Sequence, residues 1–463
     1  MFAVKRGEAK ERLDVTYNDP KFLATIERIA KISIPFGKTI ESISGGATPL
    51  RANDAQYSDD GIKFLRIQNV TPFGIDLNDV KHIVPEVHNG LLSRSQLATG
   101  DLLMTITGRI GTCSVVTEDV LPANINQHIV RIRLKNDLLP EFAAAYLNSD
   151  IGQKFSNRGV TGTTRIALDY ESIKRIPVPL IDQQEQLRLA EFMNAATQSR
   201  SEKLRDASTV VEQAKNAMFT ELGIDFPDFR PQTYIYSRLR DIRSSEIFCN
   251  QNIGFATELF NALRDSRHYA GNLNEFVDVN PRTGMSALTD DSKVTFIPMP
   301  AVGEKNNEVE YSFEKYYAVK SGYTIFQRGD LLWAKITPCM QNGKSCLVED
   351  LPTEIGFGST EFHVMRKKSD KVYMPFIWAL FSNGYILKAA QSMFNGSAGQ
   401  QRVSDHFLKK FPLILPEIQT QKILADKIFA ALDTARVLRA EAETEWATAK
   451  AKFERELLGG TGK

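Results

Sequence analysis

The sequence predicts an α+β protein in which two similar globular domains, each with a β core, are joined and separated by two long antiparallel helices that form a coiled coil. Residues 182–222 and 416–458 each carry an unbroken helical pattern, long enough for about 60 Å of helix. The segments before them repeat at an offset of about 235 residues, nearly from end to end. We therefore expect two copies of one module, related by a pseudo-twofold axis.

Local signals mark both ends of each helix. Asp182 and Glu185 have the spacing of an N-terminal capping box, and Gly223 follows as a C-terminal cap. The second helix is expected to begin at Pro416, a residue suited to the first helical position, and to end before Gly459. Residues 223–245 then form a linker, and 459–463 a tail.

Each helix has a narrow apolar stripe that it cannot bury by itself. A spacing near 3.5 residues is typical of coiled coils, so the two stripes are expected to face each other. The alternative is two unrelated surface helices, each packed on its own domain. The predicted interface residues are Leu187, Met193, Leu204, Val211 and Met218 in the first helix, and Leu424, Ile428, Ala435, Leu438 and Phe453 in the second.

The globular domains are expected at residues 1–181 and 246–415. In the first, β-type runs separated by Gly, Pro and Asn occupy 61–70, 101–107, 113–117 and 129–134, and helical patterns follow at 139–149 and 150–155. The second repeats this order at 294–299, 330–336, 346–349 and 361–366, with a helix at 373–381. A weaker helical pattern at 22–31 has its counterpart at 255–264.

Short motifs recur in both halves. Gly100-Asp101-Leu102-Leu103 matches Gly329-Asp330-Leu331-Leu332, His128-Ile129-Val130 matches His363-Val364-Met365, and the loop 159–165 matches 396–402. Both loops end in arginine, but their hydrogen-bonding side chains differ. We interpret this as two readers of different halves of a bipartite target. The two histidines are most simply strand residues with hydrogen-bonded rings.

Polar loops and basic doublets supply the candidate contacts to a nucleic acid. Hydroxyl, amide and guanidinium groups hold phosphates or reach base edges. The alternative for any single residue is an ordinary solvated turn. The candidates are Thr48, Arg51, Arg109, Thr161, Thr163, Thr164, Arg165, Lys174 and Arg175 in the first half, and Lys335, Asn342, Lys344, Ser397, Gln400, Gln401, Arg402, Lys409 and Lys410 in the second.

Composition narrows the class of protein. The chain has 57 basic and 56 acidic side chains, so it lacks the positive excess of a protein that holds DNA alone. Binding would then depend on local patches or on a partner's positive surface. No apolar run of membrane-spanning length and no signal peptide is found, so a cytoplasmic location is expected. The 4 cysteines lack metal-site spacing and are expected to be reduced thiols.

Motifs for catalysis are absent from the sequence. An adenine methyltransferase needs a glycine-rich cofactor loop and an Asn/Asp-Pro-Pro-aromatic site, but the chain contains no Pro-Pro, and Gly356-Phe357-Gly358 lacks a following Rossmann helix. Neither a P-loop nor a carboxylate–lysine nuclease cluster is present. The chain is expected to bind without catalysing, and to hold neither a metal nor a cofactor.

Taken together, these features resemble a type I restriction-modification specificity subunit. The resemblance runs from Arg12 to Gly459. It depends on the order of the Gly-Asp-Leu-Leu strand, the loop ending in arginine, and the Pro177-Val178-Pro179 entry into a helix with paired glutamines. The second half departs from this pattern, because 411–416 lacks the tight Pro-x-Pro.

The resemblance implies two target recognition domains, each reading half of a split site on double-stranded DNA, with the helices as a spacer. It also implies two methyltransferase subunits, which carry the S-adenosylmethionine chemistry, and in some systems translocase-nuclease subunits. Two other classes stay open. One is an enzyme that both recognises and methylates DNA, and the other is a coiled-coil scaffold that binds proteins instead of DNA.

Overall fold

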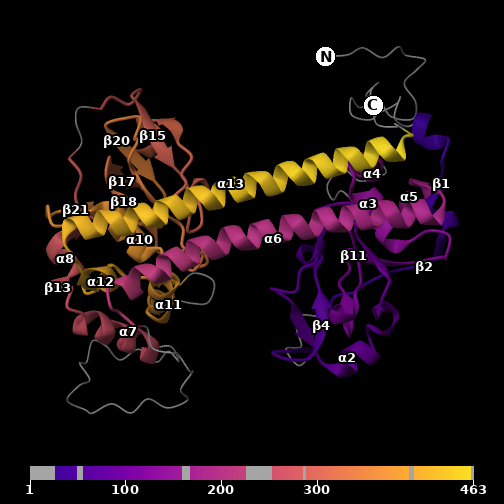
Figure 1. Cartoon of the computed structure of the whole chain (residues 1–463), viewed down its shortest axis with the longest axis horizontal. Helices are drawn as coiled ribbons and strands as arrows, with labels where there is room; N and C mark the ends of the chain where they lie inside the picture. The colour runs from indigo at the N-terminus through magenta and orange to yellow at the C-terminus, as the bar shows by residue number, and fades with distance from the viewer. Residues whose placement is uncertain are drawn as a thin grey trace. The chain divides into compact units, whose positions relative to one another are not determined.

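The computed structural model describes residues 27–49, 56–158, 167–225, 253–284, 288–395 and 401–459. Contacts divide the chain into unit 1 (Met1–Lys203 with Ala440–Lys463) and unit 2 (Leu204–Arg439). The boundary runs through both long helices, which Figure 1 labels α6 and α13. Each unit therefore combines one globular part with half of each long helix.

The globular part of unit 1 is built on two sheets. The main sheet has the order β2-β11-β8-β9, from β2 (Ile40–Gly45), β11 (Ile129–Leu134), β8 (Leu102–Thr105) and β9 (Cys113–Val115), all antiparallel neighbours. The other has the order β10-β4-β7-β3, from β10 (Ala123–Ile125), β4 (Ile62–Leu65), β7 (Lys81–Ile83) and β3 (Tyr57–Ser58), with β10 and β4 parallel. The β core expected for this half is confirmed.

Unit 2 repeats this topology. Its main sheet has the order β14-β21-β18-β19, from β14 (Val277–Val279), β21 (Phe362–Lys367), β18 (Leu331–Ala334) and β19 (Ser345–Leu347). Its other sheet has the order β16-β15-β20-β17, from β16 (Ser312–Lys315), β15 (Lys293–Ile297), β20 (Ile355–Gly358) and β17 (Thr324–Gln327), with β15 and β20 parallel. The units differ at one edge, because β3 extends the sheet beyond β7 whereas β17 extends it beyond β20.

Shorter elements complete the two units. Two-stranded sheets are β1 (Ser33–Pro35) with β12 (Pro177–Pro179), β13 (Tyr269–Asn272) with β24 (Pro412–Ile414), β5 (Val70–Thr71) with β6 (Gly74–Ile75), and β22 (Phe394–Asn395) with β23 (Arg402–Val403). The helices of unit 1 are α2 (Pro85–Asn89), α3 (Pro140–Asn148), α4 (Asp150–Arg158) and α5 (Tyr170–Arg175). Those of unit 2 are α7 (Ile253–Asp265), α8 (Leu273–Phe276), α9 (Tyr316–Val319), α10 (Met374–Phe381), α11 (Gly384–Ser392) and α12 (Asp405–Lys409).

The structure explains the recurring Gly-Asp-Leu-Leu motif. Gly100 and Gly329 have φ values of 84° and 85°, a left-handed turn that favours glycine. Asp101 and Asp330 follow as buried carboxylates, each accepting hydrogen bonds from this turn and from an arginine of the neighbouring strand. The motif leucines are buried on both faces of β8 and β18. The motif therefore closes a turn and begins the central strand of each main sheet.

The arginines that pair with these aspartates show that one predicted match was out of register. Arg133 in β11 and Arg366 in β21 occupy equivalent places, so the two strands correspond at an offset of 233 (366 − 133). His128 therefore corresponds to Glu361, and the match of His128 with His363 is wrong by two residues. A shift of two keeps each side chain on the same face of a strand, so the apolar pattern could not reveal the error.

The first long helix, α6 (Gln183–Glu221), begins where the sequence predicted. Asp182 accepts the backbone N–H of Gln184 at 2.8 Å. Glu185 is ion-paired with Arg188 at 2.6 Å instead of completing the capping box. At the other end, Gly223 has φ 67° and forms the expected left-handed cap.

The second long helix, α13 (Ile418–Leu457), begins two residues later than expected. Pro416 lies outside the helix, because the first helical backbone hydrogen bond runs from the N–H of Gln421 to the carbonyl of Glu417 at 3.0 Å. Gly459, with φ 72°, ends the helix as predicted.

The apolar faces of α6 and α13 are buried in each unit together with the globular part. Met193 and Phe453 belong to one cluster of unit 1. The main cluster of unit 2 contains Val211, Met218, Leu424, Ile428 and Ala435, with Leu438 packed against it, and Leu204 is half-buried. The assignment of Leu187 to this interface is wrong, because its side chain is 51% exposed. The fully buried Gln186 faces the globular part and sets the rotation of the first turn, which directs Leu187 to solvent.

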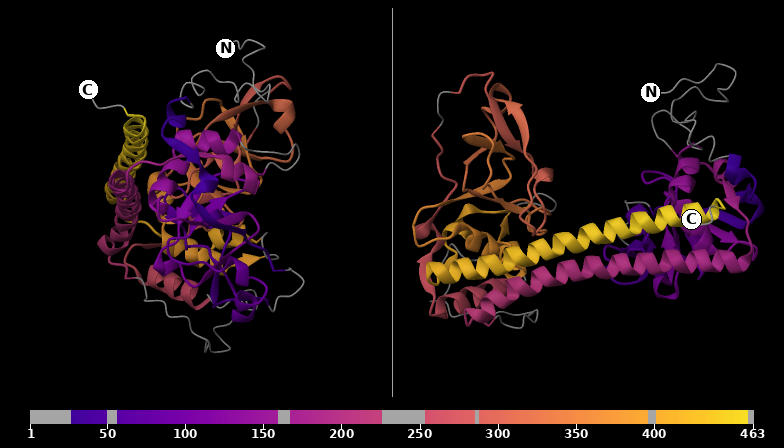
Figure 2. Two further views of the ribbon diagram at one scale, coloured as in Figure 1. Left: turned by 90° about the vertical axis from the view of Figure 1, so that its right-hand side faces the viewer. Right: turned by 45° about the horizontal axis from the view of Figure 1, so that its top comes forward.

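Ion pairs across the helices show their direction within each unit. In unit 1, Arg188 pairs with Glu456 at 2.6 Å and Arg200 with Glu443 at 2.6 Å, so residue numbers rise along α6 as they fall along α13. In unit 2, Lys427 pairs with Glu221 at 2.8 Å. The expected antiparallel pairing is confirmed in each unit, and Figure 2 shows the two helices from further directions. These exposed pairs add little stability but favour one alignment.

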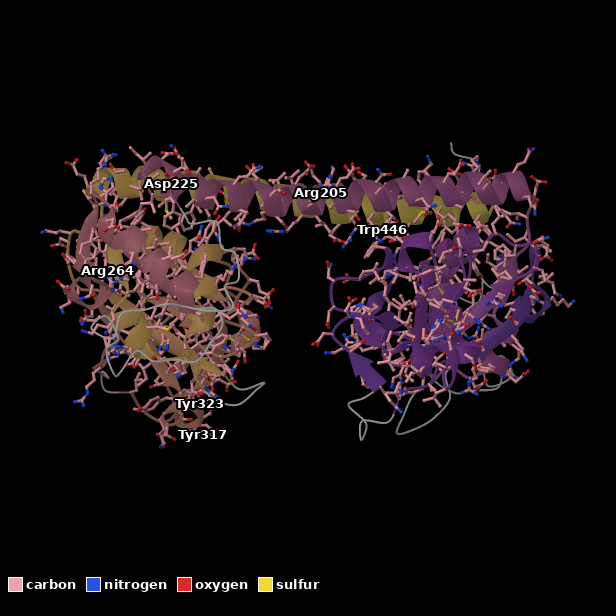
Figure 3. The ribbon with its side chains drawn as sticks, turned by 90° about the horizontal axis from the view of Figure 1, so that it is seen from below. Arg205, Asp225, Arg264, Tyr317, Tyr323 and Trp446 are labelled. Carbon is pink, nitrogen blue, oxygen red and sulfur yellow. The ribbon has the colours of Figure 1, made fainter. Side chains whose placement is uncertain are left out.

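An aromatic contact joins the globular part of unit 1 to the helices. Phe73, in the turn between β5 and β6, packs edge-on against Trp446 of α13 with ring centroids 5.1 Å apart. The guanidinium of Arg200 lies 3.8 Å from the centre of the same ring. Figure 3 shows Trp446 extending from α13 toward the globular part. Both helices therefore contact the same hairpin.

In unit 2, a buried lysine connects the globular part to a long helix. Lys215 of α6 is fully buried and donates hydrogen bonds to the carbonyls of Lys305, at 3.0 Å, and Ser382, at 3.4 Å. Its ammonium lies 4.9 Å from the ring centre of Trp378. Burial lowers the pKa of Lys215 to about 7. A polar contact thus connects the globular part of unit 2 to α6.

Candidate nucleic-acid interface

Loops that are distant in the sequence meet at one end of the main sheet in unit 1. β2 and β8 end here and β11 begins here, because these strands are antiparallel neighbours. Thr48 donates a hydrogen bond to the side-chain oxygen of Gln127, and Thr107 is hydrogen-bonded to His128 at 2.9 Å. Arg109 is exposed in the loop after β8. These five residues define what we call loop surface 1.

The matching end of the main sheet in unit 2 carries loop surface 2, defined by Asn280, Lys335, Glu361, Gln401 and Arg402. The backbone N–H of Lys335 donates to the carbonyl of Glu361 at 2.9 Å. The carbonyl of Gln401 accepts the N–H of Thr337 at 3.0 Å, and Asn280 is hydrogen-bonded to His363 at 3.0 Å. The structure therefore brings together Lys335, Gln401 and Arg402, which the sequence had predicted from separate loops.

An ion pair dominates the electrostatics of loop surface 2. Arg402 donates to both carboxylate oxygens of Glu361, from Nε at 2.9 Å and from Nη2 at 2.8 Å. The hydrogen bond from Arg402 lowers the pKa of Glu361, so the carboxylate is ionised at neutral pH. Burial lowers the pKa of the neighbouring His363, whose Nε2 donates to the carbonyl of Val403 at 2.9 Å. This histidine is a bonded strand residue, as expected.

Several candidates lie outside the described residues. They are Arg51, Thr161, Thr163, Thr164, Arg165, Ser397 and Gln400. The proposed match of Arg165 with Arg402 can still be corrected, because Leu168 and Val403 donate equivalent backbone hydrogen bonds, to Ile106 and Lys335. Ala167, not Arg165, therefore occupies the place of Arg402.

Asn342 and Lys344 are directed away from loop surface 2. Asn342 donates to the carboxylate of Glu304 at 3.0 Å, and Lys344 donates to the carbonyl of Met299 at 3.4 Å. Both partners belong to the 299–305 segment, which also contacts α6 through Lys305. The loop after β18 thus begins at loop surface 2 and ends beside a different part of the unit.

The basic doublet of unit 1 lies away from loop surface 1. Space next to Gly45, at the end of β2, is filled by Tyr170, whereas Lys174 fills the space next to Gly37 before β2 begins. Helix α5 therefore runs along β2 and carries Lys174 and Arg175 to the opposite end of the sheet. In unit 2, Lys409 is paired with Asp405 at 2.6 Å, and Lys410 is exposed at the corresponding end of α12.

Gly46 offers a direct test of how tightly loop surface 1 is built. A Cβ atom at this buried position would overlap the carbonyl oxygens of Ile125 and Asn126. Gly46→Ala should lower the free energy of unfolding of unit 1 by ~1–3 kcal/mol, measured by denaturant titration. Gly284→Ala, in open space after β14, is the control and should have little effect. Equal stability of the two variants would show that loop surface 1 adjusts freely.

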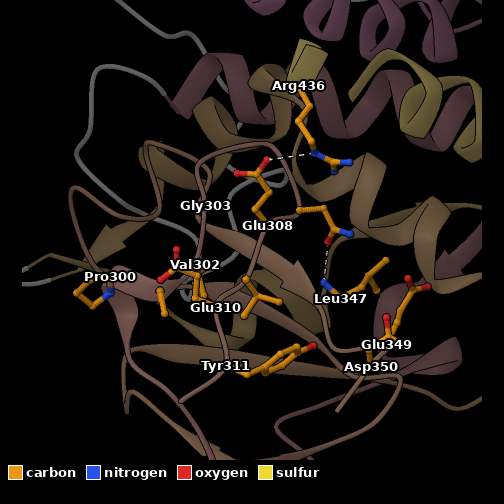
Figure 4. A pocket seen from close by; sticks show the side chains of 13 residues that line it. Pro300, Val302, Gly303, Glu308, Glu310, Tyr311, Leu347, Glu349, Asp350 and Arg436 are labelled. Atoms are coloured by element: carbon orange, nitrogen blue, oxygen red, sulfur yellow. Dashed lines mark hydrogen bonds and ion pairs between the residues drawn. The ribbon is translucent and has the colours of Figure 1, made fainter. Parts of the chain in front are cut away.

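A pocket of about 620 Å³ lies elsewhere in unit 2, between residues 300–311, the end of β19 and α13. Figure 4 shows the side chains that line it, with Arg436 near Glu308 at 3.6 Å. Glu310, Glu349 and Asp350 add further negative charge to its walls. Because phosphates are anionic, this pocket is unsuited to a nucleic-acid backbone.

In the part of the chain that the structure describes, no group of three or more His, Cys, Asp or Glu side chains is arranged to hold a metal ion. Within the same residues, no helix has both the length and the apolar character needed to cross a lipid bilayer.

Comparison with known families gives a match in both halves of the chain. The model of the type I restriction modification DNA specificity domain matches residues 42–213 and again 270–442. Together these segments cover most of the sequence and include both main sheets, both loop surfaces and most of both long helices. The chain belongs to this family.

Curated members of the specificity subunit family match part of the chain. The specificity subunit of the type I restriction enzyme EcoAI from Escherichia coli is 37% identical over 151 residues, 32% of this chain and 25% of that protein. The EcoEI specificity subunit from the same species is 34% identical over 145 residues, 31% of this chain and 24% of that protein. The matched segments thus span about a quarter of the length of these relatives.

A solved structure gives a more extended alignment. It comes from a study of complex assembly and conformational transition of the type I R-M system, and it covers 93% of this chain and 98% of its own at 15% identity, with a TM-score of 0.48. The family assignment depends on the two domain matches, not on this alignment.

Five residues of the loop surfaces are not among the predicted contacts: Thr107, Gln127 and His128 on loop surface 1, and Asn280 and Glu361 on loop surface 2. Gln127 has no polar counterpart in a repeated motif that would have marked it in the sequence. Asn280 has φ 53°, a left-handed conformation that Asn adopts more readily than most residues, and the Val279-Asn280-Pro281 sequence is a turn signal. Glu361 could have been found from the correct register of β21, for which the Arg133 and Arg366 match was the available signal.

Proposed function

We propose that this chain is the DNA sequence-recognition subunit of a type I restriction-modification complex, and that each unit reads one half of a bipartite site through its loop surface. The observation that supports this most is the repeated architecture. Units of the same topology present different polar side chains at the same end of the main sheet, in a chain that matches the specificity domain twice. Two copies of one fold that carry different side chains in their loops suit a target with two different half-sites.

The methyl transfer is assigned to partner subunits. We expect two methyltransferase subunits to supply S-adenosylmethionine and its chemistry, and translocase-nuclease subunits to join in some assemblies. The near-neutral charge of this chain fits a protein that shares DNA with such partners in the cytoplasm. A single enzyme that both recognises and methylates DNA is the alternative.

Selection from a randomised duplex library tests this proposal. The full chain, alone and with the methyltransferase subunit, should enrich one bipartite sequence with an unread spacer. Labelled S-adenosylmethionine should transfer no methyl group to DNA when the chain is alone, and should do so when the partner is added. Transfer by the isolated chain would favour the single-enzyme alternative, and the absence of any enriched sequence would favour a protein-binding scaffold.

The helices are proposed to set the spacing between half-sites. Helices α6 and α13 have 39 and 40 residues. A seven-residue insertion after Lys203, matched by one after Arg439, would lengthen each helix by ~10 Å while keeping the coiled-coil phase. The preferred spacer should then grow by about three base pairs, at 3.4 Å each. A library with variable spacers measures this, and an unchanged spacer would contradict the proposed role of the helices.

A further inference from the structure

His128 and Glu361 have different side chains but equivalent backbone positions in the two units. The N–H of Ile106 donates to the carbonyl of His128 at 3.0 Å, and the N–H of Lys335 donates to the carbonyl of Glu361 at 2.9 Å. Since these bonds are equivalent, the difference between an imidazole and a carboxylate does not arise from a difference in fold. The two loop surfaces therefore differ at a position where the framework is shared.

Glu361 is able to act as a hydrogen-bond acceptor at the surface. Its two carboxylate oxygens offer about four acceptor sites, and the two hydrogen bonds from Arg402 use one on each oxygen. About a quarter of its side chain, 24%, is exposed. Arg402 holds the carboxylate in one orientation, because a bidentate pair restricts both groups. A further donor can therefore approach Glu361 from solvent.

The bases differ in what they would offer this carboxylate. In the major groove, cytosine presents the N4 amino donor, whereas guanine presents two acceptors and thymine one. Adenine offers a donor at N6, but its N7 acceptor lies beside it and would repel the carboxylate. An ionised carboxylate on a DNA surface is tolerated where cations are close, and Arg402 and Lys335 supply them here. Cytosine is the base that this arrangement fits.

We propose that Glu361 is a specificity-determining residue that accepts a hydrogen bond from the N4 amino group of a cytosine in the half-site read by unit 2. This inference rests on the proposed function and adds to it the identity of one base pair. His128 occupies the matching place on loop surface 1, so the half-site read by unit 1 does not share this preference.

Glu361→Gln tests the role of the carboxylate at nearly constant side-chain size. The full chain, assembled with its methyltransferase subunit, would be used to select from a randomised library. Wild type should require a C·G pair at one position of one half-site, and the variant should lose this preference by about tenfold or more. The other half-site should be unchanged. Asp291→Asn is the matched control, because Asp291 is an exposed carboxylate of unit 2 paired with Lys315 at 2.9 Å, and it should leave every base preference intact.

A second measurement changes the DNA instead of the protein. Each cytosine of the selected half-site is replaced in turn by 2-pyrimidinone, which lacks the N4 amino group, and binding by the wild-type chain is measured. One replacement should weaken binding about tenfold, and the same replacement should have little effect on Glu361→Gln. If Glu361→Gln fails to fold, the wild-type chain still tests the inference, because the lack of an effect at every cytosine would overturn it.

The outcomes separate this inference from the proposed function. Selection of a bipartite sequence without a cytosine that responds to either change would overturn the inference and leave the proposed function in place. A uniform loss of affinity for all sequences in Glu361→Gln would do the same. If the wild-type assembly selects no sequence at all, the proposed function itself fails.

Discussion

Replacing Asp330 by alanine should lower the free energy of unfolding of unit 2 by about 3–5 kcal/mol, because it removes one partner of a buried ion pair. Asp330 is fully buried, and its oxygens accept hydrogen bonds from Arg366 Nε at 2.7 Å and Nη2 at 2.6 Å. One of them also accepts the N–H of Gln327 at 2.8 Å. The variant leaves a guanidinium that is only 17% exposed without its carboxylate.

The equivalent change in unit 1 provides a graded comparison. Asp101 is buried, but its partner Arg133 is 41% exposed and can be solvated when the carboxylate is removed. Asp101→Ala should therefore cost less, about 2 kcal/mol, as for the loss of a charged hydrogen bond. Hydrogen exchange during denaturant unfolding assigns each loss to its unit. Equal losses in the two variants would contradict this dependence on burial of the arginine.

A double substitution distinguishes the contribution of the Asp330–Arg366 ion pair from that of the turn that Asp330 caps. Asp330→Leu combined with Arg366→Met replaces both charges by apolar groups and should recover much of the stability lost in Asp330→Ala. Failure to recover it would show that the turn capped by Asp330 matters more than the charge pair.

Gln421→Ala should destabilise unit 2 by about 3 kcal/mol, because it leaves buried backbone groups without partners. Its amide is fully buried, accepts the N–H of Tyr373 at 2.9 Å and donates to the carbonyls of Lys371 at 2.7 Å and Pro416 at 2.8 Å. Gln186 makes the equivalent contacts in unit 1, with Leu139, Asp137 and Ile181. Gln186→Ala should have a similar effect there.

The second glutamine of each pair supplies the control. Gln419 and Gln184 are exposed in the same helical turns, so their replacement by alanine should change the unfolding free energy by less than about 0.5 kcal/mol. Thermal unfolding of the four variants measures the contrast. A loss in the exposed variants comparable to that of Gln421→Ala would show that helix propensity, not the buried amide, is responsible.

The long-period features of this fold could be predicted from the sequence. The two long helices, the duplication and the main strands all follow from patterns that extend over many residues, so a local error does not remove them. The paired glutamines form a repeated motif, but the sequence does not show which glutamine of each pair is buried. Leu187 was misplaced for the same reason, since the buried Gln186 sets the rotation of the turn.

The candidate site was predicted less well than the fold. A shift of two residues in a strand preserves its apolar pattern, so the match of His128 is corrected from Arg133 and Arg366, whose pairing with the buried aspartates fixes the register. The basic doublets at Lys174 and Lys409 were grouped with the loops on charge alone. The distance of Lys174 from loop surface 1 follows from the direction of α5 along the sheet, which residue types do not encode.

The division of the long helices between the units has a consequence for synthesis of the chain. The core of unit 1 includes Ala449, Phe453 and Leu457, from the last turns of α13. A ribosome that has completed the globular part of unit 1 has not yet made these residues, and it must first translate all of unit 2. The core of unit 1, which is translated first, is thus completed last. A chain that stops before residue 440 leaves the apolar face of unit 1 exposed to solvent.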